Sequence, residues 1–232
     1  MKKHGKKYRA AKEKASISGS LTVDNGVAKV KELAYASFDE SVDVSVGLGI
    51  DPAKGEHAVR GSIILPHRVG KEVRVLVFAK GEYADRALKA GADFVGANDL
   101  IEKIQGGWLE FDYAIATPDI MGAVGKLAKV LGQRGLLPNK KLGTVTFDVE
   151  IVVADLKKGR AFFKNDKSGL VNFSVGRVSL SPAQIKDNLM AFIYALNAAR
   201  PAKAKGKFIR KVTLSSTMGI GVPIGVDELI KM

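Results

Sequence analysis

The sequence predicts an α/β protein in which an α+β domain I is split by an inserted three-layer α/β domain II of Rossmann-like type. Residues 42–48 alternate between apolar and polar or small side chains, as in a strand with one buried face. Residues 73–78 form a nearly continuous apolar run, which is typical of a strand buried on both sides of a parallel sheet. Between residues 73 and 131 strand and helix patterns alternate, and this order places helices on a parallel sheet.

The domain boundaries are expected near residues 67 and 160, where the patterns change. A chain of 232 residues is long enough for one large or two modest domains. These boundaries divide the chain into residues 1–67, 68–159 and 160–232; if the first and last segments fold together, they form a discontinuous domain I, and residues 68–159 are an inserted domain II.

The first segment contains two expected helices and two expected strands. The helices are expected at 4–15, which is basic, and at 24–36, and the strands at 42–48 and 59–65. A linker at 16–20 separates the two helices, and a loop at 51–55 separates the two strands. Asp24 is a suitable N-cap for the second helix, because apolar residues recur at helical spacing as far as Ala36. Pro66 closes the second strand.

The middle segment alternates short strands with helices. After the run at 73–78 we expect a helix at 82–90, a strand at 93–95, a helix at 100–105, a strand at 113–116, a helix at 118–131, a loop at 132–144 and a helix at 148–158. Pro118 suits the first turn of its helix, and Gly91 and Gly159 suit helix ends. The stretch 132–144 is too rich in Gly and Pro to form a regular element.

The last segment returns to the strand and helix patterns of domain I. Strands are expected at 160–164 and 171–179 around a turn at 165–169, followed by an apolar helix at 182–198 and a strand at 207–217. The final strand carries Lys211, Thr213, Ser215 and Thr217 on one side and Phe208, Val212 and Leu214 on the other, with Arg210 as the exception.

The polar side of this final strand is a candidate contact surface for RNA. A cation followed by three hydroxyls suits phosphate oxygens and ribose 2′-hydroxyls, which recur at regular spacing. The alternative is an edge strand whose Ser and Thr side chains only face water. The strand breaks at Met218 and Gly219, where a residue without a side chain lets another backbone approach closely.

The positive charge of the chain is concentrated in its two terminal segments. A net charge of +13 favours a polyanionic partner, either nucleic acid or an anionic membrane. Residues 1–67 and 160–232 together hold 23 Lys and Arg against 12 Asp and Glu, whereas residues 68–159 hold 14 against 12. Phosphate contacts are therefore expected in domain I.

Composition also argues against several other classes. No apolar run approaches the roughly 18 residues of a membrane span, and the basic start of the chain lacks the apolar core of a secretory signal. The absence of cysteine excludes disulfides and zinc fingers and fits a reducing cytosol. The three histidines are scattered, so we expect them at surface or turn positions and expect neither a metal nor a cofactor.

Two further features are candidates for RNA contact. The turn 165–169 presents Lys167 and Ser168, which we expect to project beside the C-terminal strand, although such a composition forms a tight turn without any ligand. Phe38 lies between a helix end and a strand; such a residue usually belongs to a core but can also cover a ribose or base. We expect Lys167 and Thr217 to lie close together on one surface, where an exposed strand edge meets RNA.

Two glycine-rich stretches do not qualify as nucleotide-binding loops. The stretch 219–225 has the wrong glycine spacing, contains Pro223 and precedes no βαβ unit. The stretch 132–144 lacks the Gly-Lys-Ser/Thr ending of a triphosphate-binding loop. We recognise no nucleophile–base pair and expect no catalysis. The rival interpretations are a nucleotide- or metabolite-binding enzyme that uses domain II and a sequence-indifferent polyanion binder.

Eight short motifs occur in order along nearly the whole chain. They are Phe38-Asp39-Glu40-Ser41-Val42, Leu48-Gly49-Ile50-Asp51-Pro52, Val59-Arg60-Gly61 with Leu65-Pro66-His67, Ala90-Gly91-Ala92-Asp93, Phe111-Asp112 with Ala116-Thr117-Pro118-Asp119, Gly135-Leu136-Leu137-Pro138-Asn139, Asn165-Asp166-Lys167-Ser168-Gly169 and Ser215-Ser216-Thr217-Met218-Gly219. Each is weak alone, but the ordered set resembles the bacterial type of the L-one family of ribosomal proteins, from the large-subunit stalk beside the tRNA exit site.

The resemblance implies a non-enzymatic protein of the cytoplasmic ribosome whose domain I holds the main RNA site. It implies binding to the large-subunit rRNA stalk, a part in the release of deacylated tRNA from the exit site, and repression of translation of its own operon mRNA. We expect a monomer within the ribosome and no membrane contact. The RNA contacts implied position by position are Phe38, Ser41, Lys167, Ser168, Ser215, Thr217, Met218 and Gly219, to which the polar strand face adds Lys211 and Thr213.

Some positions depart from the family pattern. Gln133, Lys140 and Ile220 stand where prolines are usual, and Asn172 replaces a frequent His. Lys211 stands where relatives have Ser, so we expect it to add salt-sensitive affinity rather than specificity.

Overall fold

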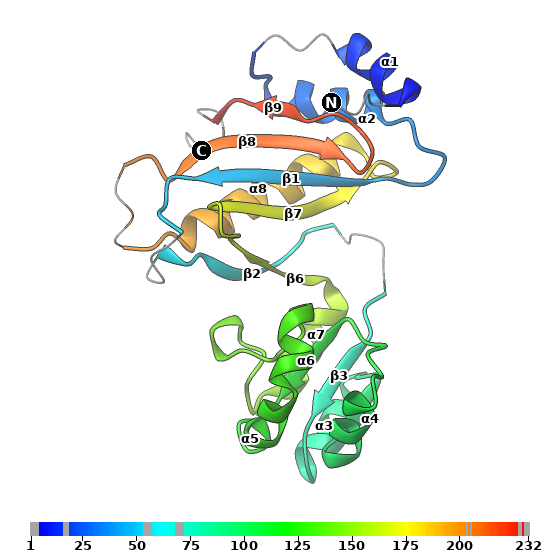
Figure 1. Ribbon diagram of the computed structural model, residues 1–232, viewed down its shortest axis with the longest axis vertical. Coiled ribbons are helices and arrows are strands. Elements are labelled where there is room, and N and C mark those ends of the chain that lie inside the picture. The colour runs from blue at the N-terminus through cyan, green and yellow to red at the C-terminus, as the bar shows by residue number, and fades with distance from the viewer. Residues whose placement is uncertain are drawn as a thin grey trace. The chain divides into compact units, whose positions relative to one another are not determined.

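The computed structural model describes residues 5–15, 19–52, 57–67, 72–202, 204, 206–226 and 229 (Figure 1). The chain divides into two compact units. Unit 1 consists of Met1–Gly70 with Phe162–Met232, and unit 2 consists of Lys71–Ala161. Segments from both ends of the chain therefore contribute to unit 1. The expected linker at 16–20 and the loop at 51–55 lie partly outside the described residues.

Unit 1 is built on a four-stranded antiparallel sheet with the order β7-β1-β8-β9 (Figure 1). The strands are β1 (Ser41–Leu48), β7 (Leu170–Arg177), β8 (Ile209–Ser216) and β9 (Val222–Ile224). One face is apolar because alternate residues point to the same side, as with Val42, Val44 and Val46 of β1, which are all buried. Helices α2 (Val23–Leu33) and α8 (Pro182–Ala198) cover that face, and the opposite face carries the polar side chains.

Helix α8 has a complete start signal and an apolar stripe. The Ser181 hydroxyl accepts a hydrogen bond from the Gln184 backbone N–H, while the Gln184 side chain accepts one from the Ser181 N–H, with Pro182 in the first turn. Five of its apolar residues are buried: Ile185, Leu189, Phe192, Ile193 and Leu196. Each such side chain stabilises the fold by about 1.5–3 kcal/mol relative to exposure. This helix confirms the prediction for 182–198.

Helix α1 (Lys6–Ala15) packs against α2. Ala11 and Ala15, four residues apart, lie on one helix face and are buried, whereas the lysines are exposed. The two-stranded sheet of β2 (Arg60–Ile64) and β6 (Arg160–Lys164) completes the regular elements near the main sheet.

Two expectations for unit 1 need correction. Helix α2 is capped by Thr22 rather than Asp24, because the Thr22 hydroxyl accepts a hydrogen bond from the Asn25 N–H. It ends at Leu33 rather than Ala36, because Ala34 has an extended conformation and the next backbone N–H groups bond to a carboxylate outside the helix.

Strand β8 lies between β1 and β9 and is therefore not an edge strand. Its register against β1 shifts between Gly47, which faces Lys211, and Leu48, which faces Ile209. At this point β8 has one more residue than β1 between the paired positions, and Arg210 is this extra residue of a β-bulge. The bulge explains why Arg210 departs from the alternation that the rest of the strand follows.

Unit 2 contains a parallel three-stranded sheet with the order β4-β3-β5. Its elements are β3 (Val75–Phe78), α3 (Glu82–Lys89), β4 (Phe94–Gly96), α4 (Asn98–Gln105), β5 (Tyr113–Ala116), α5 (Met121–Val124), the 3₁₀ turn η2 (Gly125–Leu127), α6 (Ala128–Arg134), the 3₁₀ turn η3 (Lys140–Leu142) and α7 (Val149–Lys158). Leu76 and Phe78 pack in one core with α4, α5, η2 and α6, while α3 and α7 contact β3 and each other. The structure thus confirms the parallel α/β arrangement.

The single helix expected at 118–131 is wrong in detail. Pro118 lies in a turn before the first helical residue, Met121, whose N–H donates to the Pro118 carbonyl at 3.3 Å. The helical path then passes through a 3₁₀ segment and ends at Arg134. Gly122 and Gly125 explain the irregularity, because glycine lowers helix stability by about 1 kcal/mol per interior position.

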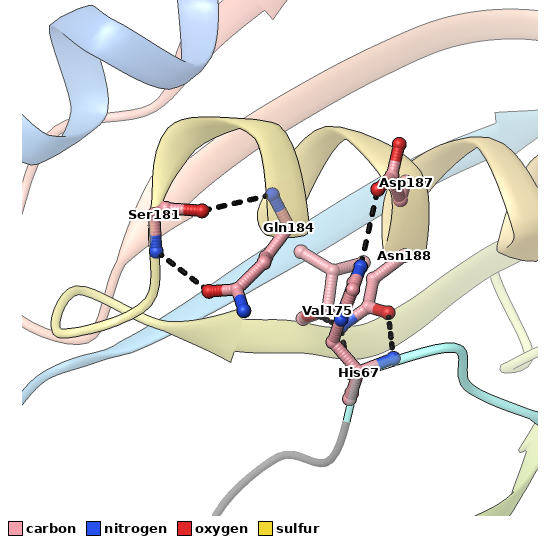
Figure 2. Close-up of polar contacts among 6 residues, drawn as sticks. All are labelled: His67, Val175, Ser181, Gln184, Asp187 and Asn188. Carbon is pink, nitrogen blue, oxygen red and sulfur yellow. Dashed lines mark hydrogen bonds and ion pairs between the residues drawn. The ribbon is translucent and has the colours of Figure 1, made fainter.

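The chain leaves unit 1 at a polar anchor on α8 (Figure 2). Asn188 is fully buried, and its Oδ1 accepts a hydrogen bond from the His67 backbone N–H at 2.9 Å. Its Nδ2 donates to the carbonyls of His67 at 3.0 Å and Val175 at 2.8 Å. The imidazole Nε2 of His67 lies 3.1 Å from Asp187 Oδ2. Residue 67, the last described before residue 72, is therefore fixed to both α8 and β7.

Candidate nucleic-acid interface

The outer surface of the unit 1 sheet is a polar face that no helix named above covers. We define the polar face by the outward residues of β7, β1 and β8: Asn172, Ser174, Asp43, Ser45, Lys211, Thr213 and Ser215. The register places Ser45 between Asn172 and Thr213, and Asp43 between Ser174 and Ser215. Most of these groups are hydroxyls and amides in cross-strand rows, which can donate to and accept from ribose and phosphate oxygens. The Ser174 hydroxyl is the exception, because its oxygen is buried.

The inner position of β8 changes how RNA could meet it. Its backbone pairs with β1 along most of its length and with β9 at Val212–Leu214, so the expected contact through an exposed strand edge is wrong for this inner part of the strand. Only the side chains of the polar face are open to a ligand there. Lys211, Thr213 and Ser215 point outward as the alternation predicts.

One end of the sheet carries most of the remaining sequence-predicted residues. We call Phe38, Ser41, Thr217, Met218 and Gly219 the end cluster. The Thr217 N–H donates to the Ser41 carbonyl at 3.0 Å, and the Thr217 hydroxyl accepts from the Ser41 N–H at 3.0 Å. Phe38 and Met218 are 55% and 51% exposed. Large apolar side chains so exposed at the end of a polar face suit contact with sugars or bases.

A buried carboxylate holds the end cluster together. Glu40 is 1% exposed, and its Oε1 accepts hydrogen bonds from the backbone N–H groups of Tyr35 at 3.1 Å and Ala36 at 2.8 Å. Its Oε2 accepts from the Met218 N–H at 3.0 Å. One side chain thus joins the segment after α2 to the segment after β8, although the two are about 180 residues apart in sequence.

The environment of Glu40 favours its ionised form. Burial raises the pKa of this carboxyl group, but the nearby Ser216 hydroxyl and the hydrogen bonds from the three backbone N–H groups outweigh it, so the pKa lies below its ordinary value. At neutral pH the group is therefore a carboxylate, and its negative charge is stabilised by hydrogen bonds from backbone N–H groups within the protein. It is not available to repel a phosphate at the surface.

Two smaller contacts fix the sides of the end cluster. The Tyr35 hydroxyl donates to the Met218 carbonyl at 2.7 Å. Asp39 accepts from the Ser179 hydroxyl at 2.8 Å and N–H at 3.1 Å, and Arg177 lies 3.6 Å away; the Ser179 hydroxyl bond contributes most to lowering the pKa of Asp39. Both contacts hold the loop that carries Phe38 between fixed points.

The turn formed by residues 216–219 explains why position 219 of the end cluster is a glycine. A Cβ on Gly219 would collide with the Ser216 hydroxyl, and the Gly219 N–H donates to the Ser216 carbonyl at 3.1 Å in a tight turn. The absence of a side chain is therefore required by this turn rather than by the close approach of another backbone.

Lys167 and Ser168 lie at the other end of the sheet. Their turn joins β6 to β7, and Asp166 Oδ1 accepts from the N–H groups of Ser168 and Leu170, both at 2.8 Å. Both side chains are exposed. Strand β1 separates this turn from β8, so its expected place beside the C-terminal strand is wrong.

The expected closeness of Lys167 and Thr217 is also wrong. Leu170, just after the turn, faces Gly47, whereas Thr217 bonds to Ser41. Along β1, the distance from Ser41 to Gly47 is about 20 Å at roughly 3.3 Å per residue. The sequence-predicted residues thus form two groups, the end cluster and the turn, joined by the polar face.

The charges along this surface are uneven. Lys211 faces Gly47, and Lys167 lies beyond the same end of β1, whereas Asp43 stands in the middle of the polar face. A carboxylate repels phosphate but accepts a hydrogen bond from a ribose 2′-hydroxyl. The arrangement therefore fits phosphates near the lysines and ribose hydroxyls over the central strands.

Unit 2 offers little support for catalysis. One pocket in this unit, of about 400 Å³, is lined by Phe94, Leu100, Lys103 and Trp108. Asp93 and Lys157 are 2.7 Å apart but outside that described lining, and Asp93 also accepts from the Val75 N–H at 2.7 Å. The pair is explained by these structural bonds. Burial raises the pKa of Asp93, but its bonds to Lys157 and Val75 outweigh this effect and lower the pKa overall.

The described ranges contain neither a candidate metal site nor a candidate membrane span. No group of three or more His, Cys, Asp or Glu side chains there could hold a metal ion. No helix in these ranges is long and apolar enough to cross a membrane.

Three residues important to the interface were not found from the sequence. Glu40 and Tyr35 act through partners near residue 218, and no local pattern indicates such a partner. Asp43 follows the alternation of its strand, so its outward direction could have been found, but its place between Ser174 and Ser215 depends on strand pairing.

Comparison with known proteins gives consistent matches. The sequence profile of the Ribosomal protein L1p/L10e family matches residues 30–220. The chain is 50% identical over 232 residues to the large ribosomal subunit protein uL1 of Chlamydia trachomatis serovar L2b (strain UCH-1/proctitis), with 100% of both chains covered.

Two further relatives have the same name. The protein of Thermus thermophilus (strain ATCC 27634 / DSM 579) is 51% identical over 225 residues, which are 97% of this chain and 98% of that one. The protein of Desulfosudis oleivorans is 48% identical over 234 residues, with 100% of both chains covered.

Proposed function

The chain belongs to the Ribosomal protein L1p/L10e family, and we propose that unit 1 binds the large-subunit rRNA stalk through the end cluster and the polar face. The family is one of structural ribosomal proteins and not of enzymes. In this proposal the protein is a constituent of the large ribosomal subunit and works in the cytoplasm as one copy per ribosome.

The end cluster is the observation that carries the proposal. Glu40 fixes its two chain segments with three backbone hydrogen bonds, so the exposed groups need little ordering when RNA binds. The Thr217 hydroxyl oxygen accepts a hydrogen bond from the Ser41 N–H. Its second lone pair can accept a hydrogen bond from a ribose 2′-hydroxyl. The groups thus suit recognition of RNA shape and 2′-hydroxyls rather than of DNA.

Lys167, Ser168, Lys211, Thr213 and Ser215 extend this site along the sheet. The lysines supply phosphate contacts, and the hydroxyls supply hydrogen bonds to ribose. Unit 1 also contains nearly all of the excess positive charge of the chain, which favours a polyanion as the ligand.

We extend the proposal to two regulatory and dynamic roles. By its membership of the family, the chain is proposed to take part in the release of deacylated tRNA from the exit site. It is also proposed to repress translation of its own operon mRNA, because an mRNA structure that imitates the rRNA stalk would fit the same interface. A reporter gene behind the operon leader tests the second role: expression should fall when the chain is overproduced, and unchanged expression would contradict it.

Titration of a stalk-rRNA fragment against a scrambled RNA of equal length tests the main proposal. We expect the stalk fragment to bind tighter by about 10³-fold or more at physiological salt, as in other specific complexes. Excess bulk tRNA should leave stalk binding intact. If tRNA displaces the stalk fragment, the chain is a sequence-indifferent polyanion binder and the proposal fails.

A further inference from the structure

A surface pocket of about 540 Å³ adjoins the end cluster. Its lining combines Lys6, Lys7 and Tyr8 of α1 with Thr217 and Met218 of the end cluster. The volume is within the range of about 300–1,000 Å³ that is typical of ligand pockets. None of the residues implied by the family resemblance comes from α1.

The sequence of α1 explains how its lysines reach this pocket. Tyr8, Ala11 and Ala15 share one helix face, on which both alanines are buried and Tyr8 is half-buried. Lys6 and Lys7 are therefore left exposed in the first turn, which contains no acidic residue. The pocket lining thus combines two lysines of α1 with Thr217 and Met218, and no Asp or Glu is among the described lining residues.

The pocket is lined by two aromatic residues, Tyr8 and Tyr35, and two hydrogen bonds hold Tyr35 in place. Its hydroxyl donates to the Met218 carbonyl at 2.7 Å, and its backbone N–H donates to the Glu40 carboxylate at 3.1 Å. An aromatic ring held at a fixed angle can stack on a base or ribose with little loss of conformational entropy.

We propose that this pocket is a second RNA subsite that accepts one unpaired nucleotide of the RNA bound by the end cluster. Lys6 and Lys7 bind its phosphate, and Tyr8 and Tyr35 pack against its base or ribose. The inference rests on the proposed function, because the pocket shares Thr217 and Met218 with the end cluster. It adds α1 to the interface and assigns the two sides of the pocket to different parts of a nucleotide.

A matched pair of double variants tests the subsite. Lys6→Gln with Lys7→Gln removes the pocket cations, and Lys12→Gln with Lys14→Gln removes the same charge from exposed positions of the same helix outside the described lining. The dissociation constant for the stalk-rRNA fragment is measured for each variant across a salt series. Circular dichroism and thermal unfolding check that both variants keep the wild-type fold, as expected for exposed substitutions.

The pocket variant should bind about tenfold more weakly, as expected when one or two charge-assisted hydrogen bonds are removed. Its dependence of log affinity on log salt should become shallower by about 0.7–0.9 for each phosphate that is no longer neutralised. The Lys12 and Lys14 variant should keep the wild-type slope. Equal losses of affinity in both variants would show a general charge effect and overturn the subsite alone. A wild-type chain with no preference for stalk over scrambled RNA would overturn both this inference and the proposed function.

Discussion

At the scale of single residues, the end cluster depends on side chains whose partners are inside the protein. Glu40 uses both carboxylate oxygens on backbone N–H groups, and Thr217 uses its hydroxyl on Ser41. These bonds fix the backbone that positions Phe38 and Met218. A mutation here therefore acts through the position of the loop as well as through the direct interaction with RNA.

Glu40→Gln should lower both stability and RNA affinity. The amide NH₂ of Gln would face a backbone N–H on one side, so at least one buried donor would lose its acceptor at a cost of about 1–3 kcal/mol. The free energy of unfolding, measured with urea at neutral pH, should fall by this amount. Glu32→Gln, at an exposed position on α2, is the control and should have a small effect.

The contribution of Glu40 should also depend on pH. Because the pKa of Glu40 is lowered in the folded state, its stabilising effect is complete above the ordinary carboxyl pKa and is lost as pH falls through the lowered value. The difference in unfolding free energy between the wild type and Glu40→Gln should therefore shrink as the solution is acidified. A difference that stays constant down to acid pH would contradict this role.

Thr217→Val keeps the shape of the side chain and removes its hydroxyl. We expect it to weaken binding of the stalk-rRNA fragment by on the order of 1 kcal/mol or more at fixed salt. Thr217→Ser restores the hydroxyl and should recover most of the affinity. An unchanged dissociation constant for a folded Thr217→Val chain would count against a role for this hydroxyl in binding.

At the scale of elements, local patterns predicted what lies inside and outside but not which strands are neighbours. The alternation in β1 and β8 was sufficient to predict their buried faces, because side-chain direction follows from the strand backbone itself. The inner place of β8 was missed because its partner β9 is only three residues long and contains Pro223. The end of α2 was missed because the competing acceptor, Glu40, lies beyond the helix.

Asn188→Ala tests the anchor at which the chain leaves unit 1. The change removes a fully buried side chain with three hydrogen bonds and leaves backbone groups of His67 and Val175 unpaired (Figure 2). The free energy of unfolding should fall by about 2–4 kcal/mol, seen as a lower urea midpoint. Asn197→Ala, exposed on the same helix, should change it by less than about 0.5 kcal/mol. Similar midpoints for the two variants would refute the anchor.

At the scale of the whole molecule, both fold class and family could be predicted from the sequence, whereas the layout of the site could not. The ordered motifs and the charge excess pointed to residues at both ends of the chain. The separation of Lys167 from Thr217, and the place of Asp43 between their groups, follow from strand register, which residue patterns do not encode. The candidate site is therefore longer than the sequence suggested, and two of its sequence-predicted residues, Lys167 and Lys211, lie toward the end away from Thr217.

Removing residues 68–159 and joining the flanks with a short flexible linker should leave most of the rRNA affinity. All residues of the proposed interface lie in unit 1, as does most of the net charge. We expect the dissociation constant for the stalk-rRNA fragment to rise by less than about tenfold, or 1.4 kcal/mol. Thr217→Val should weaken the shortened chain as much as the full chain. A shortened chain that folds but does not bind would contradict the assignment.

The most direct test of the central claim, that RNA binds the polar face and end cluster of unit 1, is site-specific photo-crosslinking. A benzophenone side chain replaces Met218 or, as a control, Tyr194, which is 49% exposed on α8 against 51% for Met218. Because α8 covers the apolar face of the sheet, Tyr194 reports on the other side of unit 1. The account predicts crosslinks to the stalk-rRNA fragment from position 218 and none above background from position 194. Crosslinks from position 194 without any from position 218 would contradict it.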